Sequence, residues 1–391
     1  MLTRQSSLIA QVKIQVDSPM KVLLVGNYEF DGSTSMKIWA NALRRELLQR
    51  KIDAELISPT PVFGRIKRSA DGLGKWFGYI DRFVIFPLNL RAAAARANVV
   101  HLCDHGSAVY ATMLKNSRVV VTCNDMVAVR GALGEVPDCP ASFFGKLLQS
   151  WICRGLERAT RVACISQATY DDAKRILKSE KNLCVILDAL NYPFAPLAAD
   201  EVIRRLASLP EVQGPFILHV GSSLMRKNRE GVLRIFAKAA EGTDMQLVFA
   251  GEALHAGQIQ LARELGVHGR IVQVVKPDVE MIEALYNRAV ALLFPSRYEG
   301  FGWPPIEAQA CGCPVVGSNI PPLVEVLRET AELRPVEDEA GMAAAVRRLA
   351  IDPEYREQLR QRGFENIRSR FQVSRMMDEY VALYRELACQ S

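Results

Sequence analysis

Two glutamates on either side of a glycine-containing loop are the residues of this sequence most suited to binding a polyol. Glu299 and Glu307 enclose the segment Gly-Phe-Gly-Trp-Pro-Pro-Ile, in which Gly300 and Gly302 allow backbone N–H groups to approach a ligand closely. An ionised carboxylate accepts hydrogen bonds from a pair of vicinal hydroxyls. The spacing therefore suits a ligand with two diols. A solvated loop glutamate and a first-turn glutamate favoured by the helix dipole explain the same spacing equally well.

The elements around this loop predict where the two carboxylates lie. Residues 290–294 form an apolar run short enough for a buried strand, and residues 306–311 begin a helix that ends at Gly312, before Pro314. Glu299 thus follows a strand, whereas Glu307 opens a helix. The helix N-terminus favours an anion or a set of hydroxyls.

A basic pair precedes a second predicted helix. The apolar strand 216–221 ends in Gly221, and Arg226 and Lys227 come directly before a helix expected over 229–240. A diphosphate at this point would meet two cations and free backbone N–H groups together. Two merely solvated cations are the weaker explanation, because positive charge at a helix N-terminus is unfavourable without an anion.

The segment from Glu299 to Glu307, followed by Ala308, Gly312, Pro314 and Val315, resembles the E-x7-E segment of the retaining glycosyltransferases of family 4. This resemblance implies that Glu299 lies by the transferred sugar and Glu307 by the ribose of a nucleotide sugar. Residues 219–228 resemble the phosphate-binding stretch of that family. The residues expected to be catalytic are Glu299, Arg226 and Lys227, and those expected to bind substrate in the second domain are Glu307, Gly221, Gly300, Phe301 and Gly302.

The resemblance also implies a fold and a domain organisation. The fold class is α/β, with two Rossmann-like domains whose mainly parallel sheets face a cleft, the GT-B architecture, and a C-terminal helix that crosses back to the first domain. A chain of 391 residues is long enough for two domains with separate cores. The expected divisions are an N-terminal extension at 1–19, an acceptor-side domain at 20–200, a nucleotide-sugar domain at 201–370 and the crossing helix at 371–391.

The first domain is predicted from its alternation of short apolar strands with helical stretches, which is typical of a parallel sheet covered on both faces. Ligands gather beyond the C-terminal strand ends of such sheets, which places His101, Asp125 and Ser166 toward the cleft. In the family, the loop containing Gly32 lies near the acceptor and the diphosphate. Asn124-Asp125 stands where many members have His-Asp. A contact of Asp125 with the acceptor and a capping role for it are equally supported.

Basic and aromatic residues alternate over residues 64–96. This stretch holds seven Lys or Arg and two Asp, a net charge of +5 in a chain whose net charge is +6. Such a composition suits an anionic membrane surface. A helix whose aromatic face packs on the domain core explains it as well. Nucleic acid is disfavoured as a partner because no recognised binding module accompanies the charge.

Other classes of protein and site are disfavoured by the sequence. No apolar run approaches the length of a membrane span and no signal peptide is present, so we expect a cytoplasmic protein, peripheral on the inner membrane face if residues 64–96 bind lipid. The sequence has nine cysteines and no C-x-x-C pair, which indicates that the cysteines are reduced thiols. His101, Cys103 and His105 lack a further ligand cluster nearby, so no metal site is expected. The absence of G-x-G-x-x-G argues against a dinucleotide, and no cofactor is expected.

The sequence therefore predicts a metal-independent hexosyltransferase that uses a nucleotide-diphosphate sugar, and the family resemblance implies that the anomeric configuration is retained. The acceptor is expected to be a saccharide or a lipid-linked saccharide in cell-envelope polysaccharide or glycolipid synthesis. Two alternatives remain open. One is a non-hydrolysing nucleotide-sugar epimerase, which shares the architecture. The other is an inactive nucleotide-sugar-binding partner subunit, suggested by Asn124 in place of the family histidine.

Overall fold

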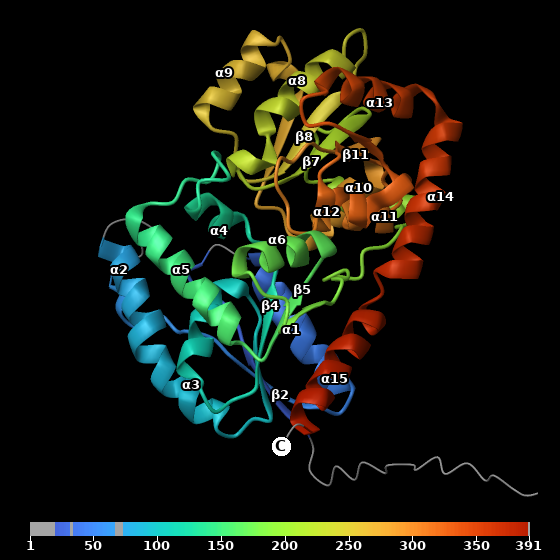
Figure 1. The fold of residues 1–391 in the computed structure, drawn as a ribbon. Coiled ribbons are helices and arrows are strands. Elements are labelled where there is room, and N and C mark those ends of the chain that lie inside the picture. Colours follow the sequence, from blue (N-terminus) through green and yellow to red (C-terminus); the bar gives the residue numbers. More distant parts are fainter. Residues whose placement is uncertain (1–19, 32–33, 67–72, 390–391) are drawn as a thin grey trace, which may run out of the picture.

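Two α/β domains stacked end to end make up the protein in a computed structural model that describes residues 20–31, 34–66 and 73–389 (Figure 1). Each domain contains a six-stranded sheet in which every strand pair is parallel. Helices cover both faces of each sheet, because strands buried on both sides must pack against apolar helix faces. The predicted α/β class with two parallel-sheet domains is confirmed.

The first domain holds a sheet in the strand order β2-β1-β3-β4-β5-β6. Its strands are β1 (Lys21–Val25), β2 (Asp53–Ile57), β3 (Val99–Leu102), β4 (Val119–Cys123), β5 (Arg161–Cys164) and β6 (Leu183–Val185). Its helices are α1 (Thr34–Gln49), η1 (Phe63–Arg65), α2 (Leu73–Ile80), the π-helix η2 (Asp81–Ile85), α3 (Phe86–Ala94), η3 (His105–Met113), α4 (Val127–Ala132), α5 (Phe143–Arg158) and α6 (Gln167–Leu177).

The second domain holds a sheet in the order β12-β11-β10-β7-β8-β9. Its strands are β7 (Phe216–Gly221), β8 (Gln246–Gly251), β9 (Ile271–Val275), β10 (Ala291–Phe294), β11 (Val315–Ser318) and β12 (Glu332–Arg334). Its helices are α7 (Ala199–Leu206), η4 (Met225–Lys227), α8 (Arg229–Ala239), α9 (Ala256–Glu264), η5 (His268–Arg270), α10 (Val279–Arg288), α11 (Trp303–Ala310), α12 (Pro321–Leu327), η6 (Arg328–Thr330), α13 (Glu339–Ile351) and α14 (Pro353–Arg370).

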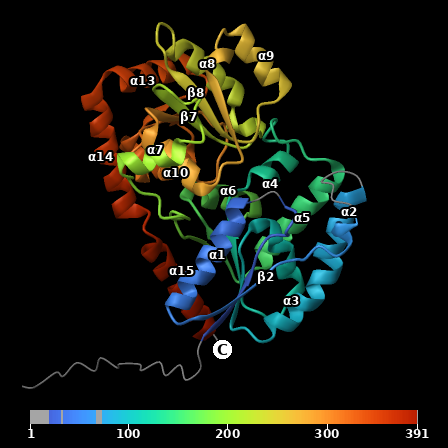
Figure 2. The same cartoon turned by 180° about the vertical axis from the view of Figure 1, so that it is seen from behind.

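The last helix, α15 (Val373–Cys389), leaves the second domain and packs on the first, as predicted (Figure 2). Its Met377, Tyr380 and Tyr384 are buried with Val22 and Trp39 in one apolar cluster. Residues at spacings of three and four lie on one helix face, so α15 offers this cluster a continuous apolar stripe. The core of the first domain therefore contains side chains from the far end of the chain.

The described part of the basic stretch 64–96 is mostly one unbroken helical run, because α2, η2 and α3 follow one another without a gap. Phe86 and Leu90 of α3 belong to the core of the first domain, which confirms that one face of this run packs there. Residues 67–72, including Lys67 and Arg68, lie outside the described residues. Among the helices that the structure describes, none has the length and apolar character needed to cross a bilayer.

Candidate functional site

The predicted donor-side residues come together because β7 and β10 are neighbours in the second sheet. The strand β7 leads through η4 to Arg226 and Lys227, and β10 leads to the loop that carries Glu299. The C-terminal ends of adjacent parallel strands lie at one edge of the sheet, where ligands bind in open α/β folds. The backbone N–H of Arg297 donates to the carbonyl of Arg226 at 2.8 Å, which joins the two loops directly.

Glu299 forms ion pairs with both predicted cations. Its Oε1 accepts from Lys227 Nζ at 2.7 Å and its Oε2 from Arg226 Nη1 at 2.8 Å. The side chains of Glu299 and Lys227 are only 7% and 9% exposed. Burial acts to raise the pKa of Glu299, but the two cations lower it below its ordinary value. Burial lowers the pKa of Lys227, although Glu299 opposes this shift. The site therefore holds two cations that are oriented by one carboxylate.

Lys227 also has apolar neighbours that fix its position. Its Nζ lies 4.7 Å from the centre of the Phe294 ring, at the end of β10, which is a cation–π distance. A Cβ on Gly221 would lie 3.5 Å from Lys227 Cδ, so the predicted glycine borders this side chain. Asn228 follows in the left-handed conformation with φ of 53°, which turns the chain into α8.

A third cation, Arg229, was not predicted by the sequence reasoning. It is buried at the start of α8, and its Nη2 donates to the carbonyls of Gly221 and Glu252, both at 2.8 Å. Arg229 thereby ties the ends of β7 and β8 together beneath the basic pair. The run Arg226-Lys227-Asn228-Arg229 was the available signal, but sequence spacing does not distinguish a buried arginine from a ligand-facing one.

Glu307 lies in the first turns of α11, as predicted, and it is buried. The Oη of Tyr286 donates to its Oε2 at 3.0 Å. Burial raises the pKa of Glu307 to about 7, against the opposing effects of Tyr286 and Lys227. Tyr286 was missed by the sequence reasoning, because nothing local to α10 indicates that its hydroxyl meets a carboxylate one strand away.

The glycines of the loop are required by its conformation. Gly302 has φ of 107° and precedes α11, and a Cβ there would lie 2.7 Å from Leu323 Cδ2. A Cβ on Gly300 would lie 1.8 Å from the carbonyl oxygen of Asn124 in the first domain. Only glycine fits such a close approach of two backbones. Position 300 is therefore where the two domains meet most closely in this loop.

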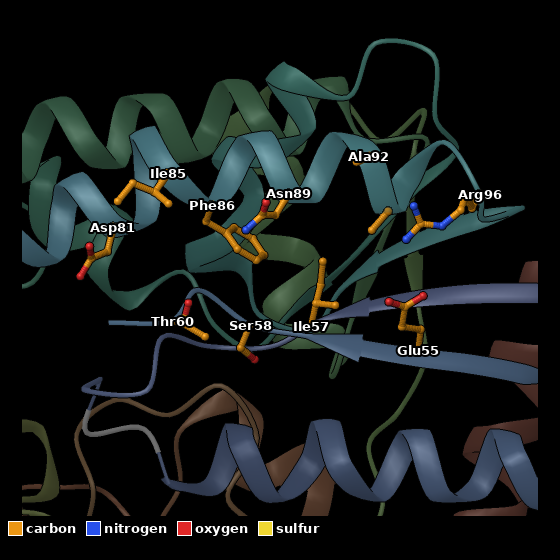
Figure 3. Close-up of a pocket in the computed structure, with 11 residues that line it drawn as sticks. Glu55, Ile57, Ser58, Thr60, Asp81, Ile85, Phe86, Asn89, Ala92 and Arg96 are labelled. Carbon is orange, nitrogen blue, oxygen red and sulfur yellow. The ribbon is translucent and has the colours of Figure 1, made fainter. Parts of the chain in front are cut away.

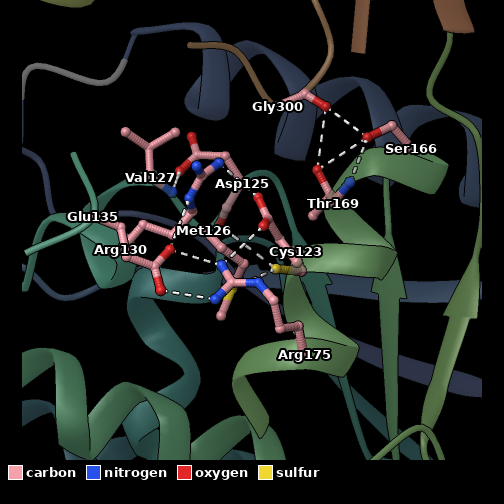
Figure 4. Close-up of polar contacts among 11 residues, drawn as sticks. Cys123, Asp125, Met126, Val127, Arg130, Glu135, Ser166, Thr169, Arg175 and Gly300 are labelled. Atoms are coloured by element: carbon pink, nitrogen blue, oxygen red, sulfur yellow. Dashed lines mark hydrogen bonds and ion pairs between the residues drawn. The ribbon is translucent and has the colours of Figure 1, made fainter. Parts of the chain in front are cut away.

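Ser166 and Thr169 hold the same loop from the first domain (Figure 4). Their hydroxyls donate to the carbonyl of Gly300 at 2.7 and 3.2 Å. Ser166 is also the N-cap of α6 and accepts from the backbone N–H of Thr169 at 3.0 Å. Ser166 was predicted to lie toward the cleft, and the structure gives it a partner in the opposite domain.

Asp125 follows β4, and Figure 4 shows it near the Gly300 loop. Its Oδ1 accepts from the backbone N–H of Val127 at 2.9 Å at the start of α4. Asp125 thus supports the turn before α4 but is not its N-cap, which is Met126, and contact with an acceptor stays a prediction. Arg130, one turn later, pairs with Asp172 at 3.0 Å, which fixes α4 against α6. Gly32 lies outside the described residues.

His101 does not reach the cleft, which corrects the prediction. It is fully buried in β3, where Nδ1 lies 2.6 Å from Tyr384 Oη and Nε2 lies 2.8 Å from Thr122 Oγ1. Burial lowers its pKa to about 3, so the ring is neutral. Tyr384 belongs to α15, and this helix covers the face of the sheet to which His101 points. His101 is a core residue.

Phe301 is likewise a core residue. Its side chain is buried, and its ring lies 5.8 Å from that of Phe371 in an edge-to-face arrangement. The side chain of Phe301 therefore belongs to the core, and a backbone contact of residue 301 with the substrate stays a prediction. Phe301 anchors the glycine loop in the second core, so its packing holds Glu299 in place.

A cavity of about 390 Å³ lies elsewhere in the first domain, between β2 and α3 (Figure 3). Its polar lining includes Glu55, Ser58, Thr60, Asn89 and Arg96, and none of the predicted site residues lines it. The donor-side residues described above are thus separate from this hollow.

Known proteins share the sequence pattern and the fold. Residues 205–366 match the family described as glycosyl transferases group 1. An N-acetyl-alpha-D-glucosaminyl L-malate synthase from Bacillus anthracis is 22% identical over 243 residues, which cover 61% of this chain and 63% of that protein. The O-antigen chain mannosyltransferase RfbU of Salmonella typhimurium is 25% identical over 218 residues, covering 55% and 58%. The chain thus spans less than two thirds of the length of these curated relatives.

Solved structures extend the likeness to nearly the whole chain. A sucrose-phosphate synthase from Thermosynechococcus elongatus superposes with a TM-score of 0.76 at 21% identity, covering 95% of this chain and 100% of that one. Anabaena Alr3699/HepE in complex with UDP-glucose gives 0.71 at 15% identity, covering 94% and 100%. These similarities confirm the GT-B fold. The family match over residues 205–366, which include residues 299–307, agrees with the resemblance predicted from that segment.

Proposed function

We propose, on the match of residues 205–366 to glycosyl transferases group 1, that the protein transfers a hexose from a nucleotide-diphosphate sugar to a saccharide or lipid-linked saccharide in cell-envelope polysaccharide or glycolipid synthesis. The observation that carries the proposal is the pairing of Glu299 with both Arg226 and Lys227 at the ends of β7 and β10. RfbU, by its name, acts on O-antigen chains, and HepE was solved with UDP-glucose.

The basic pair would bind the diphosphate of the donor. A guanidinium has five N–H donors and an ammonium has three, so each cation can hold a phosphate oxygen while it stays bonded to Glu299. The donors are oriented before the substrate arrives, because Glu299 and the Phe294 ring fix them. Preorganised charge of this kind stabilises the negative charge that develops on a leaving diphosphate.

The two glutamates would then divide the donor between them. Glu299 uses one lone pair on each oxygen for its cations, which leaves lone pairs for hydroxyls of the transferred sugar. Glu307, which lies in α11 and bonds to Tyr286, would accept hydrogen bonds from the two ribose hydroxyls. Retention of anomeric configuration follows from the family resemblance, and we assign no protein nucleophile.

Catalysis without a divalent ion is part of the proposal, because Arg226 and Lys227 can supply the charge that a metal supplies elsewhere. Turnover should be the same with and without EDTA. A requirement for added Mg²⁺ or Mn²⁺ would contradict this part of the proposal but not the assignment of the donor site.

Incubation with labelled nucleotide sugars without acceptor tests the reaction class. A transferase hydrolyses its donor slowly, an epimerase releases a new sugar isomer, and an inactive subunit binds without turnover. A thermal-shift panel of GDP-, UDP-, ADP- and dTDP-sugars identifies the donor beforehand, since a ligand at about 100 times its Kd stabilises the fold by about 2.7 kcal/mol. No stabilisation by any nucleotide sugar would contradict the proposal.

We further propose that the first domain works in the cytoplasm at the inner membrane face, where a lipid-linked acceptor would be available. The basic and aromatic stretch 64–96 supports this, because cations and aromatic rings both favour the interface of an anionic bilayer.

A further inference from the structure

We infer that the outer face of the run α2–η2–α3, together with the start of α5, is a docking surface for an anionic phospholipid bilayer. The inference rests on the proposed function only for the role of this surface, which would be to bring a lipid-linked acceptor to the cleft. We call this surface the α2–α5 face and define it by Trp76, Ile80, Val84, Leu88, Phe143, Phe144 and Leu147.

An apolar stripe runs along the solvent side of the helical run. Trp76, Ile80, Val84 and Leu88 follow one another at intervals of four residues, and each is between 37% and 67% exposed. The inward side of the same run carries the buried Phe86 and Leu90. Both sides of this helix are thus apolar, although only one of them is needed for the domain core. An amphipathic surface helix normally presents polar side chains to water.

The π-helical turn keeps this stripe aligned. Four residues slightly exceed the 3.6 residues of an α-helical turn, so a stripe with a spacing of four drifts around an α-helix. The segment η2, Asp81–Ile85, lies between the second and fourth residues of the stripe. Its i→i+5 turn takes up more residues and offsets the drift. Trp76 and Leu88 therefore lie closer to one line than in a regular helix.

The N-terminus of α5 widens the stripe into a patch. Phe143, Phe144 and Leu147 are each between 55% and 72% exposed. The ring centres of Trp76 and Phe144 are 5.4 Å apart in an edge-to-face arrangement, which places the two helices side by side at this point. A contiguous apolar patch of this kind on a soluble domain marks an interaction site.

The charges around the patch favour an anionic partner. Arg65, Arg91 and Lys146 are exposed around it. Among the described residues of 62–96, the sole carboxylate is Asp81, and it is buried. At the end of α3, Arg91 also lines a hollow of about 600 Å³ with Lys115 and Arg118, and no acidic residue is part of that lining.

This charge distribution selects a bilayer over a second copy of the chain. A symmetric dimer through the α2–α5 face would bring the same cations of two chains together, and like charges at an interface are unfavourable. A bilayer containing anionic lipid offers phosphates to the cations and an acyl region to the rings. Both features of the surface then have a partner.

The docking helix is joined to the acceptor side of the cleft. Asp81 accepts from Tyr28 Oη at 2.8 Å and from the backbone N–H groups of Phe63 and Gly64, both at 2.9 Å. Its neighbour Arg82 pairs with Asp31 at 3.3 Å. Tyr28 and Asp31 belong to the loop after β1, where the family resemblance places the acceptor. A bilayer that holds the helix therefore lies beside this loop.

Flotation with vesicles tests the surface without any need for turnover. The wild type should bind vesicles of phosphatidylcholine with phosphatidylglycerol about tenfold more tightly than phosphatidylcholine alone, and salt should weaken the binding. The double change Val84→Asp and Leu88→Asp should reduce binding by about tenfold or more. Ile351→Asp, at an even more exposed apolar residue of the second domain, should leave it unchanged. Phe144→Ser repeats the test on α5 if the double variant does not fold.

Three results would overturn the inference. In the first, the wild type does not bind anionic vesicles at low salt. In the second, the stripe variants bind vesicles as well as the wild type. In the third, the wild type is a dimer in solution and the stripe variants are monomers. Nucleotide-sugar binding is measured on the same samples. Nucleotide-sugar binding without vesicle binding would refute the docking surface and leave the proposed function intact. Vesicle binding without any turnover would refute the proposed function and leave the docking surface intact.

Discussion

Lys227 and Glu299 form a buried ion pair, 2.7 Å long, between η4 and the loop that follows β10. Arg226 binds the second oxygen of the same carboxylate. Each ion that is taken out of water costs desolvation free energy, which only good pairing repays. Two cations on one buried carboxylate leave the cluster with excess positive charge, which a diphosphate would neutralise.

Replacing either cation should slow transfer. Lys227→Ala and Arg226→Ala should each lower turnover by about 10² to 10³, because each removes one preorganised donor to the leaving diphosphate. Steady-state kinetics at saturating donor measures the effect. Lys238→Ala, at an exposed lysine that pairs with Glu339, is the control and should be neutral. Normal turnover in both site variants would remove the basic pair from the mechanism.

Glu299→Ala should lower turnover more than donor affinity, because the expected partner of Glu299 is the transferred sugar. The variant should also destabilise the ligand-free protein by about 3 kcal/mol, since it leaves Lys227 buried without its counter-ion. Added nucleoside diphosphate should restore more stability to the variant than it adds to the wild type.

Glu339 provides a matched control for this experiment, because it also pairs with one Arg and one Lys, at Arg234 and Lys238. Those two cations are far more exposed than Lys227, so Glu339→Ala should cost less stability. Equal melting temperatures of the Glu299 and Glu339 variants, with and without nucleotide, would show that the buried cluster has no special role in binding.

Glu307 should make both stability and donor binding depend on pH. Burial raises its pKa from 4.5 to about 7, so the folded protein binds this proton more tightly than the unfolded chain. The contribution to stability is complete below pH 4.5 and is lost as the pH rises through about 7. Over the same window the carboxylate forms, and the affinity for the nucleotide should rise, because only the carboxylate accepts from both ribose hydroxyls.

Titrations of nucleotide at several pH values, with Glu307→Gln as the variant that cannot ionise, measure this effect. Tyr286→Phe should shift the midpoint upward, because the tyrosine hydroxyl lowers the pKa of Glu307. A pH dependence that survives in Glu307→Gln would assign it to another group.

Gly300→Ala should separate donor binding from transfer. The added Cβ would lie 1.8 Å from the Asn124 oxygen, so the domains must move apart at this contact. Nucleotide binding, which we propose for the second domain, should persist, while turnover should fall. Gly269→Ala is the control, because no atom lies within 4 Å of its Cβ position. Equal turnover of the two variants would show that the contact at position 300 is not needed.

The order of strands and helices could be predicted from the sequence because each element has its own local pattern. The strand expected at 290–294 and the helix expected over 229–240 appear as Ala291–Phe294 and Arg229–Ala239. Both depend on apolar runs and periodicity within a dozen residues.

Contacts between distant elements could not be predicted in this way. His101 was placed at the cleft because it lies near a strand end, but its side chain points to the face that α15 covers. The hydrogen bond from Ser166 to Gly300 joins residues 134 apart, on opposite domains. Tyr286 bonds to a carboxylate on α11, and Arg229 bonds to a carbonyl just after β8. Local sequence carries no record of such partners.

The packing of α15 into the first domain has a consequence for biosynthesis. His101 and Thr122 of the first sheet bond to Tyr384 and Tyr380, which are translated only after the strands of both domains. Although the strands of the first domain leave the ribosome early, α1 covers only part of the sheet face around His101, and the rest stays uncovered until α15 emerges. The second domain, with residues 205–366 complete before then, can close its own core first. One face of the first sheet can therefore be completed only after the second domain has been translated.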